Sequence, residues 1–249
     1  RENPDTWQDF HYTCTGTYTN GDYVVNSHDG VAHGELDIYG ILGMSCNGAF
    51  DTIAQTLNST KWQKLAEDFG YNQSDRSQVD LPYKKSHFDI ASDDSVWSRM
   101  QLAIGQGTTT VTPLLNLMMY AAIANDGVMM TPYLVDHYLD ADGNVVEQTK
   151  PKALRSVCTK AEAELMDEFL TYVITNGTAA AGGSQYARVS GKTGSAQYDS
   201  TKNYHAWFCG YGTNDVSEIA VCVMIEKGGA GGIVAAPVAG QIFDYYFSR

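Results

Sequence analysis

Three segments near the end of the sequence alternate between apolar and polar residues, and they constrain the fold more than any other feature. They cover residues 188–197, 205–212 and 218–226, and turn-forming residues around Asn203 and Asn214-Asp215 separate them. Alternation with a period of two is typical of strands. Because the connections are short, successive strands can pair only in antiparallel order. The sequence therefore predicts an antiparallel meander over the last quarter of the chain.

Helical periodicity dominates the residues before these strands. Apolar side chains recur at helical spacing over residues 36–57, with an interruption from Gly43 to Gly48, which predicts a helix, a tight turn and a second helix. Thr112 and Pro113 suit the N-cap and first position of another helix. The further helices are predicted over 62–69, 114–125, 161–175 and 238–247. Helices packed around an antiparallel sheet indicate a layered α/β or α+β fold.

Less regular segments connect these elements. Residues 7–34 are polar, with a short strand-like piece at 23–25, and are expected to form loops and irregular strands. Residues 71–98 contain Pro82 and show no sustained period, which predicts a long ordered loop. Apolar residues at 135–138 and 145–147 flank an Asp- and Gly-containing stretch, which predicts a hairpin.

Size and charge limit what the chain can do. With 249 residues and 43% hydrophobic content, residues 1–249 are expected to form one domain. A formal net charge of -13 argues against binding to nucleic acid, because phosphates are repelled at long range. The longest apolar runs, such as Ile219 to Ile225, fall well short of the roughly 20 residues needed to cross a bilayer. No membrane segment is expected in this chain.

The five cysteines are Cys14, Cys46, Cys158, Cys209 and Cys222. They are scattered, without a CxxC pair or the spacing of a metal motif, so neither a metal site nor a disulfide framework is predicted. Buried free thiols are the expected state, and no cofactor is expected. The sequence opens Arg1-Glu2-Asn3-Pro4 without an initiator methionine or a signal segment, so we expect it to be cut from something longer.

The stretch Ser190-Gly191-Lys192-Thr193-Gly194-Ser195-Ala196 carries the strongest chemical signal of the predicted strands. Side chains alternate along a strand, so Lys192 and Gly194 share one face and Thr193 and Ser195 the other. A hydroxyl here could hold a carboxylate, and the backbone N–H of Ser195 could stabilise an oxyanion. By itself, Lys-Thr-Gly is a short and weak motif, and an ordinary edge strand with a solvated lysine is its usual explanation.

A second signal is Ser45-Cys46-Asn47, in the predicted turn between two helices. The Ser45 hydroxyl and the Asn47 amide could project into one cleft. Ser and Asn are also common in turns simply because they hydrogen-bond their own backbone. The order and setting of the two motifs together are more specific than either alone.

Taken together, the chain resembles the transpeptidase domain of penicillin-binding proteins, especially the monofunctional, class B kind. In that family a Ser-x-x-Lys motif, a Ser-x-Asn turn and a Lys-Thr-Gly strand follow one another, and Ser45-Cys46-Asn47 and Lys192-Thr193-Gly194 match the second and third. Similarity extends over the remaining stretches: His33-Gly34-Glu35-Leu36, Met44 to Phe50, Ile104-Gly105-Gln106-Gly107, Val111 to Leu114, Tyr120 to Asn125, Gly177-Thr178-Ala179, His205 to Phe208, and Glu226.

This resemblance implies a β-lactamase/transpeptidase-like fold with a five-stranded antiparallel sheet between helical layers. It implies an acyl-transfer enzyme acting on peptidoglycan stem peptides that end in D-Ala-D-Ala, inhibited by β-lactams and tethered to the outside of the bacterial cell membrane. Ser45, Asn47 and Lys192 would be catalytic. The substrate would be bound by Thr193, Gly194 and Ser195. Gly105-Gln106-Gly107 is expected to be mainly a turn, His205 a structural histidine, and Trp207 and Phe208 core residues.

One departure from the family pattern matters: no lysine in the chain has a serine three positions before it. The nearest pattern, Thr149-Lys150-Pro151-Lys152, contains a proline and comes too late in the order. We therefore expect a partial transpeptidase domain without its nucleophile and without the helix that carries it, inactive alone. A non-catalytic module that recognises cell-wall peptide or β-lactam with the same fold is the alternative.

Overall fold

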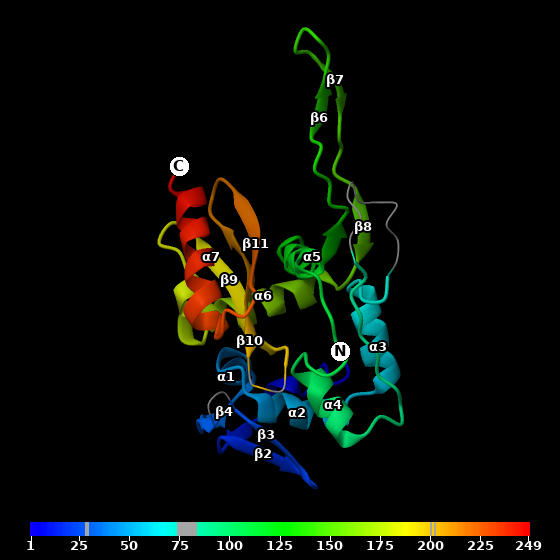
Figure 1. Ribbon diagram of the computed structural model, residues 1–249, viewed down its shortest axis with the longest axis vertical. Coiled ribbons are helices and arrows are strands. Elements are labelled where there is room, and N and C mark those ends of the chain that lie inside the picture. Colours follow the sequence, from blue (N-terminus) through cyan, green and yellow to red (C-terminus); the bar gives the residue numbers. More distant parts are fainter. Residues whose placement is uncertain (28–29, 74–83, 200, 202) are drawn as a thin grey trace.

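The computed structural model describes residues 1–27, 30–73, 84–199, 201 and 203–249. A three-stranded antiparallel sheet in the order β11-β10-β9 lies at its centre (Figure 1). Its strands are β9 (Arg188–Gln197), β10 (Tyr204–Thr213) and β11 (Glu218–Ile225). The predicted meander is confirmed. Its register is regular, with Lys192 opposite Cys209 and Phe208 opposite Val223, and β9 forms one edge.

The expectation of five strands in this sheet is not met within the described part of the chain. Every other described strand pairs in a two-stranded ribbon, β1 with β4, β2 with β3, β5 with β8 and β6 with β7, so none extends the central sheet. These strands are β1 (Tyr12–Cys14), β2 (Thr17–Asn20), β3 (Tyr23–Asn26), β4 (Gly34–Leu36), β5 (Val128–Met130), β6 (His137–Leu139), β7 (Val145–Gln148) and β8 (Ala153–Ser156). The predicted hairpin is confirmed as β6 and β7, which project from the body (Figure 1).

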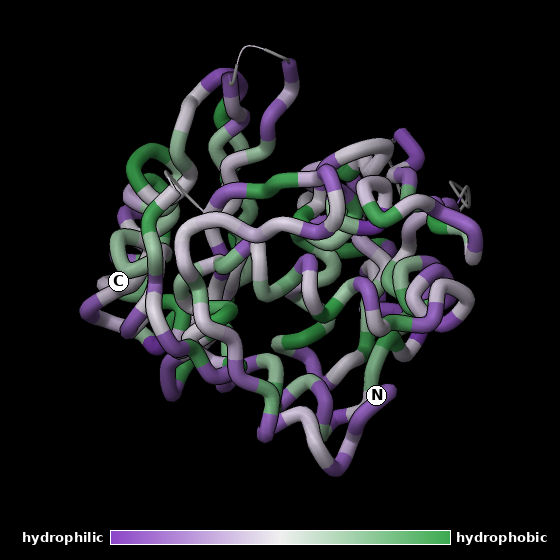
Figure 2. The backbone as a smooth tube through the Cα atoms, turned by 90° about the horizontal axis from the view of Figure 1, so that it is seen from below, coloured by the Kyte–Doolittle hydropathy of each residue, from purple (hydrophilic) through white to green (hydrophobic). Residues whose placement is uncertain are grey.

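Helices cover both faces of the central sheet. They are α1 (Ile38–Gly43), α2 (Asn47–Thr56), α3 (Ser59–Asp68), α4 (Val96–Ala103), α5 (Pro113–Ala124), α6 (Lys160–Asn176) and α7 (Gly231–Phe247), with 3-10 turns at Trp7–Asp9 and Ala180–Gly182. Helix α7 packs on one face, and α5 and α6 pack on the other (Figure 1). Phe208 of β10 and Phe243 of α7 are fully buried in the core between the sheet and α7. Figure 2 shows hydrophobic segments running through the interior and hydrophilic ones at the outer turns.

Local sequence explains where several helices begin. Thr112 caps α5 by accepting a hydrogen bond from the backbone N–H of Leu115 at 3.1 Å, and Pro113 takes the first helical position, as predicted. Thr159 and Glu162 form a capping box at the start of α6. The helix, turn and helix expected over residues 36–57 are confirmed as α1 and α2.

Several predicted boundaries differ from the structure; for example, α3 begins three residues before the predicted helix over 62–69, and two other differences affect how the chain is interpreted. Residues 74–83 of the predicted loop over 71–98 lie outside the described residues, but the loop ends earlier than expected, because Ser95 caps α4 and this helix buries Met100 and Leu102. Helix α7 begins at Gly231 and runs through Pro237, which was expected to precede it. Proline has no backbone N–H, so Pro237 cannot donate to the carbonyl oxygen of Ile233, four residues earlier. Ile233 lies in the first turn of α7 and is 76% exposed, so the helix tolerates the proline. No helix in the described residues is long and apolar enough to cross a lipid bilayer.

Candidate active site

Ser45 lies in a sharp turn that ends α1 and leads into α2. The backbone N–H of Cys46 donates to the carbonyl of Ile41 at 3.0 Å, and that of Ser45 donates to the carbonyl of Leu42 at 3.1 Å. This pair of bonds is a Schellman motif, whose left-handed position is usually glycine. Ser45 occupies it with a φ of 52°. A side chain held in this conformation is unfavourable for an L-residue, and such positions cluster at functional sites.

Lys192 reaches this turn from the edge strand β9. Its Nζ donates to Ser45 Oγ at 2.8 Å and to the carbonyl oxygen of Thr193 at 3.0 Å. The two residues are 147 positions apart in the sequence. The predicted meeting of the Ser45 turn and the Lys192 strand is therefore present in the fold.

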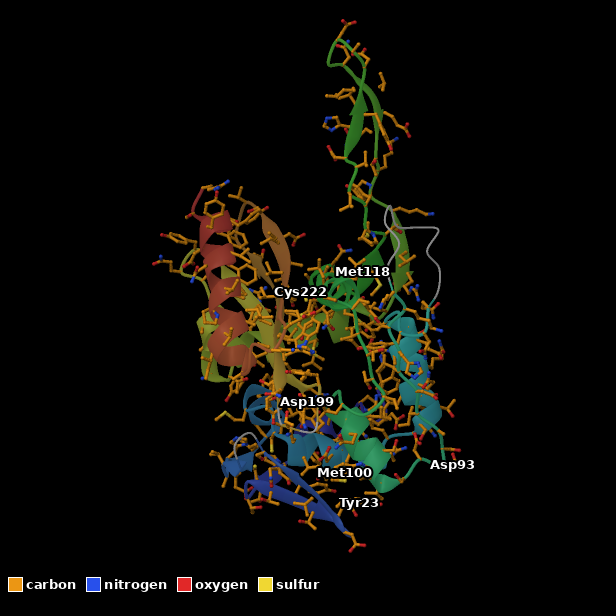
Figure 3. All side chains as sticks on the ribbon, in the orientation of Figure 1. Tyr23, Asp93, Met100, Met118, Asp199 and Cys222 are labelled. Atoms are coloured by element: carbon orange, nitrogen blue, oxygen red, sulfur yellow. The ribbon has the colours of Figure 1, made fainter. Side chains whose placement is uncertain are left out.

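A cavity of about 210 Å³ opens beside Lys192. It is bordered by residues 192–196 of β9, by the adjacent strand and by helix α5 with the turn before it. The other lining residues are Ile104, Gly105, Gln106, Val111, Asn116, Tyr120, Trp207 and Cys209. Figure 3 shows the labelled Cys222 of β11 on the side of the sheet that faces α5, and its Sγ is 3.1 Å from that of Cys209. The cavity thus lies on the α5 side of the sheet.

The cavity carries a positive charge that no described carboxylate neutralises. None of the ion pairs in the described part of the chain includes Lys192. Burial of its ammonium lowers the pKa of Lys192 to about 8. At neutral pH most of the lysine is still charged, so the site suits an anionic group and has a proton donor close to Ser45.

Side chains of β9 alternate as predicted. Lys192 faces the cavity on the α5 side, whereas Thr193 and Ser195 bond to groups near the start of α7. The Thr193 hydroxyl lies 3.1 Å from that of Thr178, and Ser195 Oγ accepts from the backbone N–H of Gly231 at 3.1 Å. Because β9 is an edge strand, residues from both of its faces border the same cavity.

Asn47 is the predicted site residue that the structure does not bring to Lys192. It is the first residue of α2, and its side-chain Nδ2 donates to the carbonyl oxygen of Asn26 in β3 at 2.9 Å. Neither Asn47 nor Ser45 is among the residues that line the cavity described above, although Ser45 contacts Lys192 at its border. The Asn47 amide here ties α2 to the β2–β3 ribbon.

Two residues, Asp167 and Thr178, hold the strand and the turn in place. Asp167 of α6 accepts hydrogen bonds from Ser190 Oγ at 2.7 Å and from Tyr211 Oη at 2.6 Å, which anchors β9 and β10 to the helix. Thr178 connects the two sides: its backbone N–H donates to the carbonyl of Gly43 at 3.0 Å, and its hydroxyl contacts Thr193. Thr178 therefore positions the turn relative to the strand.

Sequence reasoning missed several cavity residues, among them two polar ones on α5, and placed Trp207 in the core. Asn116 and Tyr120 lie one helical turn apart on α5 and both face the cavity. The visible signal was a polar pair four residues apart in an otherwise apolar helix. Trp207 was expected in the core, but it is half-buried and lines the cavity, whereas Phe208 is in the core as predicted.

The structure agrees with the expected turn at residues 105–107 and with a structural role for His205. Gly105 and Gly107 both have positive φ in the turn before α5, and Gln106 between them also borders the cavity. His205 has structural contacts: its Nδ1 accepts from the backbone N–H of Lys227 at 3.1 Å, and its ring stacks on Tyr198 at 4.4 Å between centroids.

Comparison with known proteins gives a consistent result. The chain is 28% identical over 237 residues to the peptidoglycan D,D-transpeptidase MrdA of Acinetobacter baumannii, covering 86% of this chain and 35% of that protein. It is 29% identical over 203 residues to the peptidoglycan D,D-transpeptidase PbpA of Mycolicibacterium smegmatis, covering 78% and 40%. The chain therefore spans well under half the length of these curated relatives.

Solved structures share the fold. The D,D-transpeptidase domain of a peptidoglycan glycosyltransferase from Eggerthella lenta matches with a TM-score of 0.84 at 27% identity, covering 95% of this chain and 59% of that one. Penicillin-binding protein 3 of Mycobacterium tuberculosis, complexed with ampicillin, matches with a TM-score of 0.79 at 26% identity, covering 97% and 57%. The family model described as the penicillin binding protein transpeptidase domain matches residues 5–244. The chain belongs to the penicillin-binding protein transpeptidase domain family.

Proposed function

We propose that this chain is the part of a peptidoglycan D,D-transpeptidase that carries the second and third active-site motifs. The observation that carries the proposal is the 2.8 Å hydrogen bond from Lys192 Nζ to Ser45 Oγ at the edge of a cavity. It joins a proton-bearing cation to a hydroxyl, the combination needed to pass a proton during acyl transfer. The family's serine chemistry supplies the context.

Each catalytic residue has a role in this proposal. Ser45 relays protons between the nucleophile and the leaving amine, with Lys192 holding its hydroxyl in position. Lys192 also supplies positive potential that lowers the free energy of the negatively charged transition state. Asn47 hydrogen-bonds the peptide amide of the substrate, which requires its side chain to exchange the Asn26 carbonyl for the substrate.

The edge strand binds the substrate. Thr193 and Ser195 hold the terminal carboxylate of the stem peptide or the carboxylate of a β-lactam, Gly194 allows the substrate backbone to approach closely, and the Ser195 N–H is one oxyanion donor. The uncompensated charge of Lys192 favours the same carboxylate. The hydroxyls of Thr193 and Ser195 already have partners at Thr178 and Gly231, so substrate binding shares or replaces these bonds.

The reaction needs a nucleophile that we place outside this chain. A serine hydroxyl attacks the carbonyl of the penultimate D-Ala, a C–O bond forms, and the peptide C–N bond breaks after the leaving D-Ala amine takes up a proton. The amine of a second stem peptide then displaces the serine. In the chain itself no lysine has a serine three positions before it.

The whole protein's setting belongs to the same proposal. The relatives' names include peptidoglycan D,D-transpeptidase, and the matched penicillin-binding protein 3 binds ampicillin. By analogy, the substrate is a stem peptide ending in D-Ala-D-Ala, β-lactams are inhibitors, and the full-length protein is tethered to the bacterial cell membrane with this domain outside the cytoplasm.

The missing Ser-x-x-Lys pattern also favours a second function, a non-catalytic module that binds cell-wall peptide or β-lactam without turnover. Both functions need the cavity and Lys192. They differ in whether a covalent acyl-enzyme ever forms in the complete protein.

Labelling with a fluorescent penicillin separates them. We expect no covalent label on this chain alone and stable label on the full-length gene product. In the full-length protein, Lys192→Met should slow labelling on the order of 100-fold, as loss of a transition-state charge contact does, and the exposed Lys61→Met should not. Label on the isolated chain would refute an outside nucleophile. A full-length protein that binds penicillin but is never labelled would establish the binding module.

A further inference from the structure

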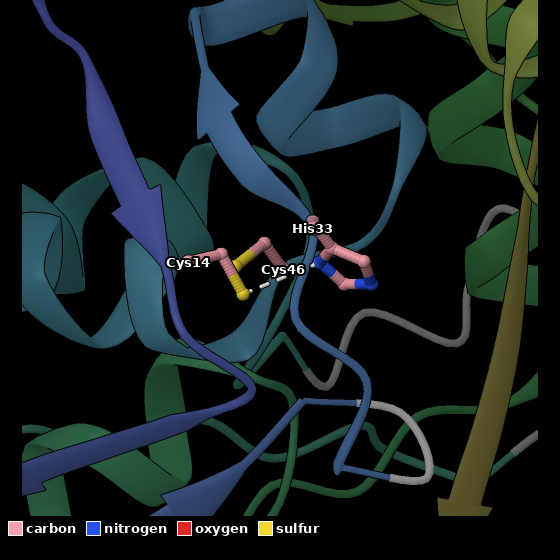
Figure 4. Close-up of side chains that lie close together, drawn as sticks. All are labelled: Cys14, His33 and Cys46. Carbon is pink, nitrogen blue, oxygen red and sulfur yellow. Dashed lines mark hydrogen bonds between the residues drawn. The ribbon is translucent and has the colours of Figure 1, made fainter.

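Two thiols and an imidazole point toward one another in a cluster beside the Ser45 turn (Figure 4). They belong to Cys14 at the end of β1, His33 just before β4, and Cys46 at the N-cap of α2. The antiparallel register pairs Cys14 with Gly34, which brings the neighbouring His33 close to it. Sequence spacing did not predict this cluster, because the three residues come from three separate elements.

The donor atoms of the cluster lie near the spacing that a tetrahedral metal ion requires. The Sγ atoms of Cys14 and Cys46 and a ring nitrogen of His33 all lie within 4.8 Å of one another, and Cys14 Sγ is 3.4 Å from His33 Nδ1. Tetrahedral zinc with ligands at about 2.3 Å for sulfur and about 2.0–2.1 Å for nitrogen separates sulfur from nitrogen by about 3.6 Å and sulfur from sulfur by about 3.8 Å. Small adjustments of side chains are therefore enough for all three atoms to bind one ion.

A fourth polar group completes the cluster. The Ser27 hydroxyl is buried, 3.1 Å from Cys14 Sγ and 4.0 Å from Cys46 Sγ. It lies close enough to take the fourth corner of a tetrahedron or to orient a water molecule there.

The geometry points to a zinc site formed by Cys14, His33 and Cys46, with the fourth position at Ser27. Two thiolates and an imidazole are the donor set that Zn²⁺ prefers, and zinc needs no redox partner. Binding releases the two thiol protons to solvent and forms two S–Zn bonds and one N–Zn bond. This assignment does not depend on the proposed acyl transfer.

Such an ion would fix the Ser45 turn. Cys46 stands between Ser45 and Asn47, so an ion bound to its sulfur would tie this turn to β1 and to the approach to β4. The role is one of positioning, because none of the three ligands lines the cavity beside Lys192.

The competing outcome is a disulfide between Cys14 and Cys46. It would need an external disulfide oxidant to accept two electrons and two protons, and it would leave His33 without a role in the cluster. Both thiols are free in the structure. The test therefore includes the oxidation state.

Metal content of the thiol-reduced full chain tests the site. After equilibration with Zn²⁺ and gel filtration, we expect one zinc per chain, and substitution by Co²⁺ should give thiolate-to-cobalt charge-transfer absorption. Cys14→Ser and His33→Ala should weaken zinc binding on the order of 100-fold or more. Cys158→Ser and Cys209→Ser, which remove thiols elsewhere, should bind like the wild type.

The cobalt spectrum of the wild type reports the thiolate ligands without any substitution, so the result does not rely on a variant of Cys46, whose side chain is fully buried. Three outcomes would overturn the assignment: a reduced chain that retains no zinc, zinc binding unchanged in Cys14→Ser, or a native chain about two mass units lighter with Cys14 and Cys46 in one disulfide-linked peptide.

Discussion

Asp167 and Asp51 sit on opposite sides of the candidate site, and their surroundings are opposite too. Asp167, on the strand side formed by β9 and α6, accepts hydrogen bonds from Ser190 and Tyr211 and pairs with Arg188 at 2.7 Å. Asp51, on the turn side formed by the Ser45 turn and α2, is fully buried, and neither carboxylate oxygen has a hydrogen-bond partner among the described residues.

The difference shows where the site is held firmly and where it is not. On the strand side, polar groups are paired and keep Lys192 in place. On the turn side, a buried unbonded carboxylate and a left-handed serine both raise the free energy of the folded state. The position of Lys192 is therefore set by packing and hydrogen bonds, whereas the Ser45 turn is held at an energetic cost.

Of the variants that test this difference, Asp51→Asn should change the stability of the protein most. Burial raises the pKa of Asp51 to about 7, above its value in the unfolded chain, so the folded state favours the protonated acid. The stability that the protonated acid contributes is fully present below about pH 4, and it is lost as the pH rises toward 7. Above pH 7 the variant should be about 2–4 kcal/mol more stable than the wild type, and near pH 4 the difference should nearly vanish.

Denaturant unfolding across this pH range measures that difference. Asp215→Asn, in an exposed turn, is the matched control and should show no comparable slope. A variant whose advantage over the wild type does not change between pH 4 and 7 would mean that Asp51 is not buried as a carboxylic acid.

Asp167→Ala tests the strand side and should act in the opposite direction. It leaves the hydroxyls of Ser190 and Tyr211 without their acceptor, so the free energy of unfolding should fall by about 2–3 kcal/mol. Asp142→Ala, on the exposed tip of the β6–β7 hairpin, should change it by less than about 0.5 kcal/mol. Equal effects at the two positions would show that the Asp167 network does not stabilise β9.

Lys192 connects the strand side to the turn side, and its lowered pKa should make the free energy of unfolding depend on pH. The pKa falls from 10.5 to about 8 on folding, so between these values the unfolded chain binds more protons and stability rises with pH. The gain of the wild type relative to Lys192→Met over this pH range should be about 1–3 kcal/mol. The exposed Lys61→Met provides the control, and a wild type without this rise would contradict the lowered pKa.

The sequence predicted the strand side better than the turn side. Alternation over residues 188–197 predicts β9 to the residue, because one strand's period and its flanking turns are local information. The contact between Lys192 and Ser45 depends on how distant elements pack, so it could be expected only through the family resemblance. The start of α7 was misjudged because Pro237 looks like a local break, while the helix is in fact stabilised by its buried face.

Other features of the turn side left no local signal. Ser45 takes a backbone conformation for which glycine is the usual residue, so propensity alone points away from it. The cluster of Cys14, His33 and Cys46 forms because β1 pairs with β4 and this ribbon packs against α2. The spacing of cysteines along the chain does not indicate it. On α5, the polar pair Asn116 and Tyr120 does stand out in an apolar helix, but the direction in which it faces depends on how α5 packs against the sheet.

The smallest effect should be the difference in stability between Ser45→Gly and Ser45→Ala, which measures the conformational cost of the turn. Both variants lose the hydroxyl that Lys192 contacts, so their difference isolates the backbone. Glycine adopts the left-handed conformation freely and alanine does not, so Ser45→Gly should be more stable by about 1 kcal/mol. At Ser98, inside α4, the same pair should differ by a similar amount with the opposite sign, because alanine favours a helix interior. Since both positions start from serine, chemical denaturation of the four variants compares backbone conformation directly, and an alanine at position 45 as stable as glycine would show that the turn is not held against its preference.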